Sequence, residues 1–435
     1  MQRRTRQRDF RLVAILAATG LAALTALAGC AAGPGSAAAN SSGSSTSGTL
    51  TISSTTTEKP ALDAVIALFE KKYPGVHVQT SFADTDQYQA TLRTELTAGT
   101  APDVIHVWPG NGNPAAMQVV QPAGYLTDLS SMSWTSTLPA SLKAVTQING
   151  KTWMLSTTVT GIGAIYNQTA MQQAGLTAPQ TWSQLLAFCT AAKAKGKVAF
   201  ALGIQTPWVT QLIDYALVPT TVYAGDPGFD SQQASGQATF ASSGWLTAMN
   251  KYLQMNASGC FNTDPLGVSY PSSLTMVAQG KALSVVQTTA ALAQLKLDAP
   301  SGTAFNVLPL PATDDAAQTE MAGGAGGGYA VNATAKNKAL AEEFIEFLAT
   351  PTAMDTYASI DGGTPSIPNA QYTSSPALAT LIQYEKAGKT VPFMDQFWPN
   401  PKVQADHFVG VQELFDGKAT PAQVLQQMQT AYKGD

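Results

Sequence analysis

The sequence has few of the side chains on which hydrolases and metalloenzymes depend. Only three histidines and three cysteines occur among its 435 residues. The histidines, His77, His106 and His407, stand in segments with strand or helix periodicity, where packed or surface histidines outnumber catalytic ones. The motifs H-E-x-x-H, G-x-S-x-G and C-x-x-C do not occur. We therefore expect a protein that is not an enzyme and needs no metal or cofactor, although scattered carboxylates could still form a glycosidase pair.

Arginine is almost confined to the amino terminus. Arg93 is the only arginine after residue 29. Five of the 24 Lys and Arg residues and one of the 28 Asp and Glu residues precede residue 30, which leaves a net charge of −8 on the remainder. Nucleic acids and anionic membrane surfaces bind clusters of cations. Neither is therefore expected as a partner.

The first 30 residues are typical of a secretory leader. Five arginines precede an apolar run over residues 12–27 that is too short for a comfortable membrane-spanning helix. The run ends in Leu27-Ala28-Gly29-Cys30, which resembles the lipobox of bacterial lipoproteins, where the cysteine becomes the first mature residue and carries acyl chains. We predict a lipoprotein signal peptide over residues 1–29 and lipidation of Cys30. An ordinary signal peptide with a chance cysteine, or a leader that stays attached, is the alternative.

A stretch without large apolar side chains follows the leader. Ala31 to Gly48 consists of small and polar residues with one proline, so burial cannot offset the entropy of ordering it. Residues 30–48 are therefore predicted to be a flexible tether, with an r.m.s. reach of roughly 23 Å. A folded body on such a tether could tilt and swivel above a bilayer.

Two cysteines remain once Cys30 is acylated. Cys189 lies in a segment with helical apolar periodicity, and Cys260 follows another. Cysteines outside the cytoplasm usually pair. A Cys189–Cys260 disulfide is predicted, and two buried free thiols are the alternative.

Strand-like and helix-like segments alternate along the rest of the chain. The first such segments cover residues 49–56, 60–75, 76–82, 87–99 and 103–108. A second run of the same kind begins at residue 161. This alternation is typical of βαβ units on a mostly parallel sheet. The sequence therefore predicts an α/β fold with two lobes, between which the chain could cross more than once.

Several segments resemble, in order, the extracellular solute-binding proteins of ABC importers (family 1), in the sugar-binding group that includes maltose-binding protein. They are "ELTAGTAPDVIHVW", "GKTWMLSTTVTGIGAIYNQTAMQQAGLTAPQTWSQLL", "VAQGKALSVV" and "GGAGGGYAVNATAKNKALAEEFIEFLAT…DGGTPSIP". Their shared order over the whole mature chain carries the resemblance.

The resemblance implies a bilobed periplasmic-binding-protein-like fold of type II, with several hinge crossings. The lobes would comprise residues 49–158 with 305–373 and residues 162–304 with 376–435. Flexing is expected at residues 158–162, which include Gly161, and at return crossings near Phe305 and Ser374. The lobes would move as rigid bodies about these points.

The same resemblance implies a receptor. The chain would be a monomer, lipid-anchored outside the cytoplasm through Cys30, that binds a sugar or oligosaccharide between its lobes. It would close on the ligand and deliver it to the permease subunits of an ABC transporter. A tether raises the effective concentration of such a receptor at the permease.

Candidate ligand-binding residues follow from the family's contact loops. Sugars need hydrogen bonds for their hydroxyls and aromatic rings for their C–H faces. "GIQTPW" places Trp208 as a stacking platform beside Gln205 and Thr206. The remaining candidates are Trp108, Asn111 and Asn113 in "VWPGNGNP", Thr56, Thr57 and Glu58, and Thr160, Gln287 or Thr288, Gly324 and Trp398.

Two departures from the family pattern affect the ligand. The segment "VVQTTAALA" has no aromatic residue where maltodextrin binders often have one. Few charged residues stand at the expected cleft positions, where Thr160 and Thr206 replace carboxylates. A maltodextrin is therefore doubtful. The alternatives are the same fold with another solute (a polyamine, an iron complex or a phosphodiester) and a surface sensor without transport.

Overall fold

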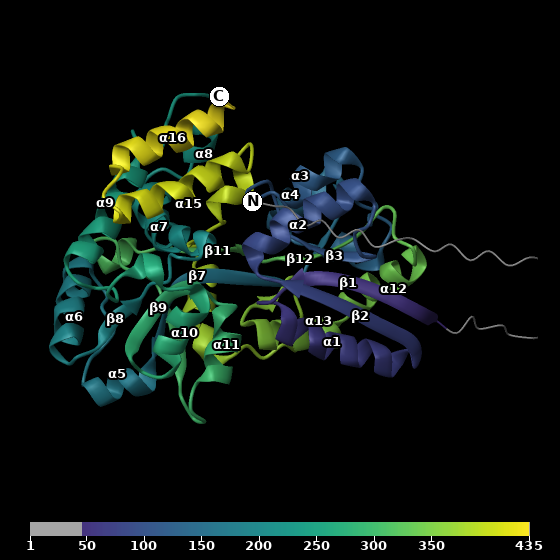
Figure 1. Ribbon diagram of the computed structural model, residues 1–435, viewed down its shortest axis with the longest axis horizontal. Helices are drawn as coiled ribbons and strands as arrows, with labels where there is room; N and C mark the ends of the chain where they lie inside the picture. Colours follow the sequence, from purple (N-terminus) through teal and green to yellow (C-terminus); the bar gives the residue numbers. More distant parts are fainter. Residues whose placement is uncertain (1–45, 435) are drawn as a thin grey trace, which may run out of the picture. The chain divides into compact units, whose positions relative to one another are not determined.

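Two mixed β-sheets, each covered by helices, are built from residues 46–434, the part of the chain that this computed structural model describes (Figure 1). Cys30, the predicted signal peptide and most of the predicted tether lie outside the described residues. The fold is α/β and bilobed, with one sheet in each lobe.

The first sheet has the strand order β2-β1-β3-β12-β6. Strand β1 is parallel to β2 and β3, whereas β12 is antiparallel to β3 and β6. The bounds are β1 (Ser47–Thr55), β2 (Gly75–Ala83), β3 (Val104–Val107), β6 (Leu155–Ser156) and β12 (Gly328–Val331). The short hairpin β4 (Gln147–Ile148) and β5 (Lys151–Thr152) stands apart from it.

Helices cover both faces of this sheet because side chains alternate along each strand. Val104 of β3 packs with α1, α12 and α13, and Ile105 packs with α2 and α3 on the opposite face. The helices are α1 (Lys59–Lys72), α2 (Thr85–Ala98), α3 (Met117–Val120), α4 (Ala140–Thr146), α12 (Lys338–Leu348) and α13 (Pro351–Asp361). Helix α1 buries Leu62, Val65 and Phe69 on one stripe, as their helical spacing predicts.

The second sheet is centred on β7. Its main strand order is β14-β11-β7-β9-β8, and β10 and β13 also pair with β7. The bounds are β7 (Thr158–Asn167), β8 (Val198–Ala201), β9 (Ala282–Thr288), β10 (Phe305–Leu308), β11 (Met321–Ala325), β13 (Thr364–Pro365) and β14 (Thr390–Val391).

Helices again lie on both faces of the second sheet (Figure 1). Helices α6, α7, α9, α15 and α16 contribute to one core, and α10, α11 and α14 contribute to the other. The bounds are α5 (Gln168–Ala174), α6 (Trp182–Ala194), α7 (Leu212–Val218), α8 (Phe229–Ala234), α9 (Gly244–Ala257), α10 (Tyr270–Ala278), α11 (Ala291–Asp298), α14 (Ala379–Lys386), α15 (Lys402–Phe415) and α16 (Pro421–Lys433). Two short 3-10 helices, η3 (Pro207–Gln211) and η8 (Met394–Phe397), border the site described below.

The chain passes between the two sheets three times. It leaves the first sheet after β6, returns between β11 and β12, and leaves again after α13. The second passage contains Gly326 and Gly327. A Cβ atom on Gly327 would lie 2.4 Å from His106 Nε2, so only glycine fits without a shift of the neighbouring ring.

The predicted lobe boundary at residue 305 is wrong. Phe305–Leu308 pairs antiparallel with residues 164–167 of β7, and Met321–Ala325 contributes antiparallel pairs to residues 159–162 of the same strand, so both segments belong to the second sheet. The return crossing is at residues 325–328 and not near Phe305. The apolar strand at 305–308 looks the same in sequence whichever sheet it joins, because its burial depends on partners distant in the chain.

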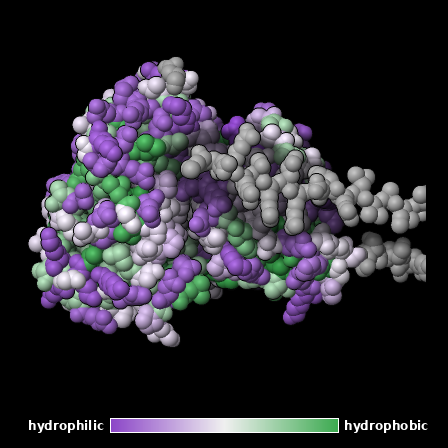
Figure 2. Space-filling model, in the orientation of Figure 1, coloured by the Kyte–Doolittle hydropathy of each residue, from purple (hydrophilic) through white to green (hydrophobic). Residues whose placement is uncertain are grey.

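The predicted disulfide is present. Cys189 on α6 and Cys260 after α9 are bonded, with 4.7 Å between their Cα atoms. Within residues 46–434, no helix has the length and apolar character needed to span a membrane. Figure 2 shows hydrophilic side chains over much of the visible surface, with hydrophobic ones in small groups.

Candidate functional site

A cavity of about 160 Å³ lies between the two sheets and takes its walls from both lobes. An adjoining cavity of about 330 Å³ opens beside it, and the two share wall residues that include Thr57, Trp208 and Tyr270. We call them the inner and the outer cavity.

Three aromatic rings project into the inner cavity from opposite lobes. Trp108 follows β3 in the first lobe, and Trp208 lies on η3 in the second. Tyr270, at the start of α10, packs against Trp208 with ring centroids 4.8 Å apart. Both Trp208 and Tyr270 also line the outer cavity. These half-buried rings offer exposed apolar faces at both sides of the space.

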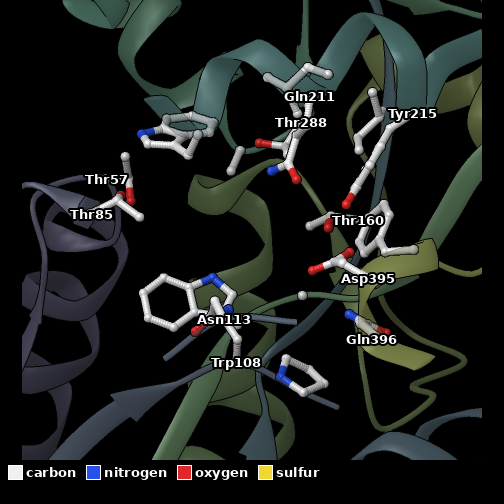
Figure 3. A pocket seen from close by; sticks show the side chains of 18 of the residues that line it. Thr57, Thr85, Trp108, Asn113, Thr160, Gln211, Tyr215, Thr288, Asp395 and Gln396 are labelled. Atoms are coloured by element: carbon white, nitrogen blue, oxygen red, sulfur yellow. The ribbon is translucent and has the colours of Figure 1, made fainter. Parts of the chain in front are cut away.

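Uncharged polar side chains occupy the wall between the rings (Figure 3). The first lobe contributes Thr57, Thr85 and Asn113, and the second contributes Thr160, Gln211, Thr288 and Gln396. Asn113 accepts a hydrogen bond from the Ala115 N–H at 3.0 Å, which leaves its amide group to donate. The wall therefore combines ring faces with hydroxyl and amide groups.

Three carboxyl groups complete the inner cavity, namely Glu58, Asp361 and Asp395. Glu58 accepts a hydrogen bond from Tyr357, and Asp361 accepts one from Thr158 Oγ1 at 2.8 Å. Burial, followed by the neighbouring charge of Asp361, raises the pKa of Glu58 to about 8. Burial also raises the pKa of Asp361 to about 6. Because each negative charge disfavours the other, the two groups cannot easily both ionise.

Asp395 stands on the second-lobe side, on η8. Gln404 Nε2 on α15 donates a hydrogen bond to it at 2.9 Å. Burial raises the pKa of Asp395 to about 6. The Tyr215 hydroxyl on α7 points toward Thr160 and Asp395 in Figure 3. Oxygen atoms from three separate elements thus converge at this end of the cavity.

Buried polar groups beneath the walls hold these side chains in place. His106 contacts the Trp108 ring edge-on, with centroids 4.5 Å apart, and burial lowers the pKa of His106 to about 3. A neutral imidazole therefore supports the first platform. In the second lobe, His407 on α15 and Asp214 on α7 form a hydrogen bond of 2.9 Å with no solvent exposure. This bond ties together the two helices that carry Gln404 and Tyr215.

Six predicted residues line the cavities. Thr57, Glu58, Trp108, Thr160 and Trp208 line the inner one, and Thr206 lines the outer one. Of the further candidates, Asn113 and Thr288 line the inner cavity and Thr56 the outer one. The hydroxyl of Thr206 accepts a hydrogen bond from the Tyr270 N–H, so it also fixes the position of that ring.

The other five predicted residues line neither the inner nor the outer cavity. Two of them, Trp398 and Asn111, make contacts within the protein instead. Trp398 is 2 % exposed and packs among Tyr215, Phe240 and Trp245, so it is a core residue rather than a platform. Asn111 donates to the Pro399 carbonyl at 2.6 Å and lies outside the cavity wall.

The other three do not line the inner cavity either. The side chain of Gln287 is fully buried on the opposite side of β9 from Thr288 and finds no partner among residues 46–434. The Gln205 side chain is exposed at the surface. Gly324 lines a separate cavity beside Thr390 and Glu385.

Sequence reasoning missed Tyr215, Tyr270, Asp361 and Asp395. Tyr270 begins a helix 62 positions after Trp208, and only the fold brings the two rings together. Asp361 ends α13 just before a crossing between the sheets. Two glycines follow it, and this pair could have indicated from the sequence that the chain turns there toward the cleft. The expectation of few charged cleft positions was wrong, because these carboxyl groups come from distant segments.

Comparison with known proteins places this architecture among binding proteins. Residues 53–355 match the family model described as "Bacterial extracellular solute-binding protein". The chain is 25% identical to the multiple sugar-binding protein of Streptococcus mutans over 356 residues, which cover 78% of this chain and 81% of the relative. It is 23% identical to the melibiose/raffinose/stachyose-binding protein MelE of Bacillus subtilis, with 87% of each chain covered.

Solved structures share the fold. RafE in complex with raffinose superposes with a TM-score of 0.75 at 19% identity, covering 89% of this chain and 99% of RafE. A sugar transporter protein of Bacillus licheniformis in complex with stachyose superposes with a TM-score of 0.72 at 22% identity, covering 89% and 99%.

Proposed function

The chain belongs to the bacterial extracellular solute-binding proteins, and on that premise we propose that it is a receptor for a sugar or oligosaccharide. The ligand would lie in the inner cavity and extend into the outer one. Closure of the lobes would enclose it, and the loaded receptor would pass it to the permease of an ABC importer. Relatives named as sugar-binding proteins at 23–25% identity support this assignment.

The observation that carries the proposal is the placement of ring faces on opposite lobes. Trp108 from the first lobe and Trp208 from the second line one cavity, together with Thr, Asn and Gln side chains. The apolar C–H faces of a sugar ring can pack on these aromatic rings, and its polar rim can form hydrogen bonds with these hydroxyl and amide groups. No Lys or Arg among residues 46–434 lines either cavity, which disfavours a phosphodiester.

A thermal-shift screen tests the proposal. A ligand that binds only the native state raises stability by RT ln(1 + [L]/Kd). The panel should contain raffinose, stachyose, melibiose, maltose and their component monosaccharides, with calorimetry on every compound that shifts the transition. We expect at least one saccharide to bind with a 1:1 stoichiometry. If none of the saccharides binds, the proposal is contradicted.

Lipid anchoring at Cys30 is part of the same proposal. The tripeptide before Cys30 and the arginine-rich leader support it. Cys30→Ser should release the mature protein into the soluble extracytoplasmic fraction, and metabolic labelling with an alkyne fatty acid should mark the unsubstituted protein only. Retention of the variant in the membrane fraction would show that the leader itself stays attached.

A further inference from the structure

The walls of the two cavities carry only one sign of formal charge. Five carboxyl side chains line them: Glu58, Asp361 and Asp395 in the inner cavity, and Asp84 and Asp86 in the outer one. Within residues 46–434, no Lys, Arg or His contributes to either lining. A space lined in this way concentrates cations and repels anions.

The protein itself leaves the inner carboxyl groups uncompensated. The salt bridges formed within residues 46–434 involve none of Glu58, Asp361 and Asp395. Each of these carboxyl groups accepts a hydrogen bond from an uncharged group instead. A carboxylate has about four acceptor positions. Acceptor capacity on all three groups, and the negative charge of Asp395, therefore remain for a ligand to satisfy.

Tyr215 supplies a second observation at the same place. It is 2 % exposed and lines the inner cavity. Its hydroxyl lies near Asp395 and Gln404 but makes no well-formed hydrogen bond with any group among residues 46–434. A buried hydroxyl without a partner costs free energy that a ligand would recover. In Figure 3 this hydroxyl points toward Thr160 and Asp395. Three oxygen acceptors thus face one point of the cavity.

The aromatic platforms complete a set of groups that favours a cation. Trp108, Trp208 and Tyr270 present ring faces, whose quadrupoles attract ammonium groups as well as sugar C–H groups. An ammonium group has three N–H donors. Asp395, Tyr215 and Thr160 offer one oxygen acceptor each to such a group.

We propose that the cleft selects a saccharide that carries a basic nitrogen, and that its ammonium group is bound by Asp395, Tyr215 and Thr160. The proposal rests on the sugar-receptor function proposed above and narrows its ligand to amino sugars and amine-bearing oligosaccharides. The rings and amides would hold the sugar frame, and the carboxyl groups would distinguish the amine from a hydroxyl or an acetamide at the same position. Such discrimination comes from leaving a charge unpaired when the wrong ligand binds.

Matched ligand series test the proposal. Chitosan oligosaccharides, N-acetylchito-oligosaccharides and cello-oligosaccharides differ only in the amine, acetamide or hydroxyl at C2. Glucosamine, galactosamine and kanamycin extend the amine group, raffinose and stachyose represent neutral saccharides, and spermidine represents an amine without a sugar. Calorimetry at pH 7 should give at least tenfold tighter binding of an amine-bearing saccharide than of its neutral counterpart, with the difference reduced in 0.5 M NaCl.

The other outcomes are distinguishable. Equal or tighter binding of neutral saccharides overturns this inference and leaves the sugar-receptor function standing. Tighter binding of spermidine than of every saccharide overturns both and indicates a polyamine receptor. Failure of every saccharide to bind overturns both as well.

Single substitutions test which side chains bind the ammonium group. Asp395→Asn should weaken binding of the amine-bearing saccharide at least tenfold and binding of its neutral counterpart less than threefold. Tyr215→Phe removes only the unpartnered hydroxyl and should reduce the preference about fivefold, which keeps the test valid even where Asp395→Asn unfolds. Asp63→Asn, at an exposed position of α1 outside both cavities, is the matched control and should change the preference less than twofold. An unchanged preference in Tyr215→Phe and in folded Asp395→Asn overturns the placement.

Discussion

The rings of Trp208 and Tyr270 pack against each other at 4.8 Å, inclined by 58°, where the inner cavity meets the outer one. Neither residue is near the other in sequence, and the Thr206 hydroxyl, by accepting from the Tyr270 N–H, fixes the approach of the two segments. The pair forms one continuous apolar surface on the second lobe. Sugar stacking on this surface is the physical basis of the first prediction.

Trp208→Ala should weaken saccharide binding by roughly 1–3 kcal/mol, because the ligand loses its ring contact and the desolvation that accompanies it. Calorimetry with a saccharide identified in the screen measures the change. The thermal transition without ligand should move little, since Trp208 is only half-buried. Unchanged affinity would show that Trp208 is a packing residue.

Trp398→Ala should have the opposite profile. Its ring lies in a core cluster with Phe240, Trp245 and Tyr215, so its removal leaves a cavity that costs about 3–5 kcal/mol of folding free energy. Denaturant unfolding monitored by circular dichroism gives the loss. Comparison with Trp208→Ala separates a core tryptophan from a binding tryptophan in one protein. A stability like that of the unsubstituted protein would contradict the burial of this ring.

Gly327→Ala should disturb the second crossing between the sheets. The added Cβ atom would lie 2.4 Å from His106 Nε2, and the His106 ring is itself confined by Trp108 and Tyr329. We expect lower thermal stability and weaker ligand binding together. Gly225→Ala is the matched control, because the nearest atom to its Cβ would be 3.8 Å away. Equal effects of the two substitutions would argue against steric confinement at the crossing.

Glu58 should make the stability of the ligand-free protein fall with rising pH. Burial and the Asp361 charge raise the pKa of Glu58 from 4.5 to about 8 in the folded protein. Between these values the folded chain holds a proton that the unfolded chain releases, so the stabilising contribution is complete below pH 4.5 and is lost as the pH rises through 8. The groups around it are Asp361, Tyr357, Tyr270 and Tyr329.

Chemical denaturation at several pH values between 5 and 8.5 measures this effect, and Glu58→Gln should flatten the profile. Asp63→Asn, at an exposed position of α1, serves as the control for the loss of a surface carboxylate. A Glu58→Gln profile as steep as that of the unsubstituted protein would assign the pH dependence to other groups.

Joint replacement of Cys189 and Cys260 by serine should reduce the free energy of unfolding by roughly 2–5 kcal/mol, because the disulfide closes a loop with a sequence separation of 71 residues. The lowered transition temperature should be reproduced by a reductant in the unsubstituted protein. A reductant should leave the transition of the double variant unchanged. Saccharide affinity should be retained, since neither cysteine lines the cavities.

The sequence was most informative where local pattern and position coincide. The alternation of strand and helix predicts the α/β lobes, and "GIQTPW" places Trp208 just past β8, where a ligand-facing loop is expected. Local pattern could not assign Phe305–Leu308 to its sheet, because pairing with β7 depends on residues about 140 positions away. It also could not separate Trp208 from Trp398, since each stands next to a proline and they differ only in what folds over them.

The carboxyl groups of the cleft show the same limit. Glu58 was identified from its place after the first strand. Asp361 stands in the quoted segment "DGGTPSIP" but was not identified as a cleft residue, and Asp395 stands in none of the quoted segments. Both join Glu58 in the cavity wall only when the chain has crossed between the sheets. Charge counted along a sequence therefore says little about charge in a cavity. The ligand chemistry follows from the assembled wall.

Asn111, which was expected to contact ligand, instead joins the two lobes. Its backbone N–H donates to the Gln396 carbonyl at 3.2 Å and its side chain to the Pro399 carbonyl at 2.6 Å. Separation of the lobes at this point would break these bonds, so we expect the Asn111 amide proton to exchange with solvent mainly from the separated state. Hydrogen exchange at this one amide would thus report the fraction of time that the receptor spends open, without a label and without contact to the ligand.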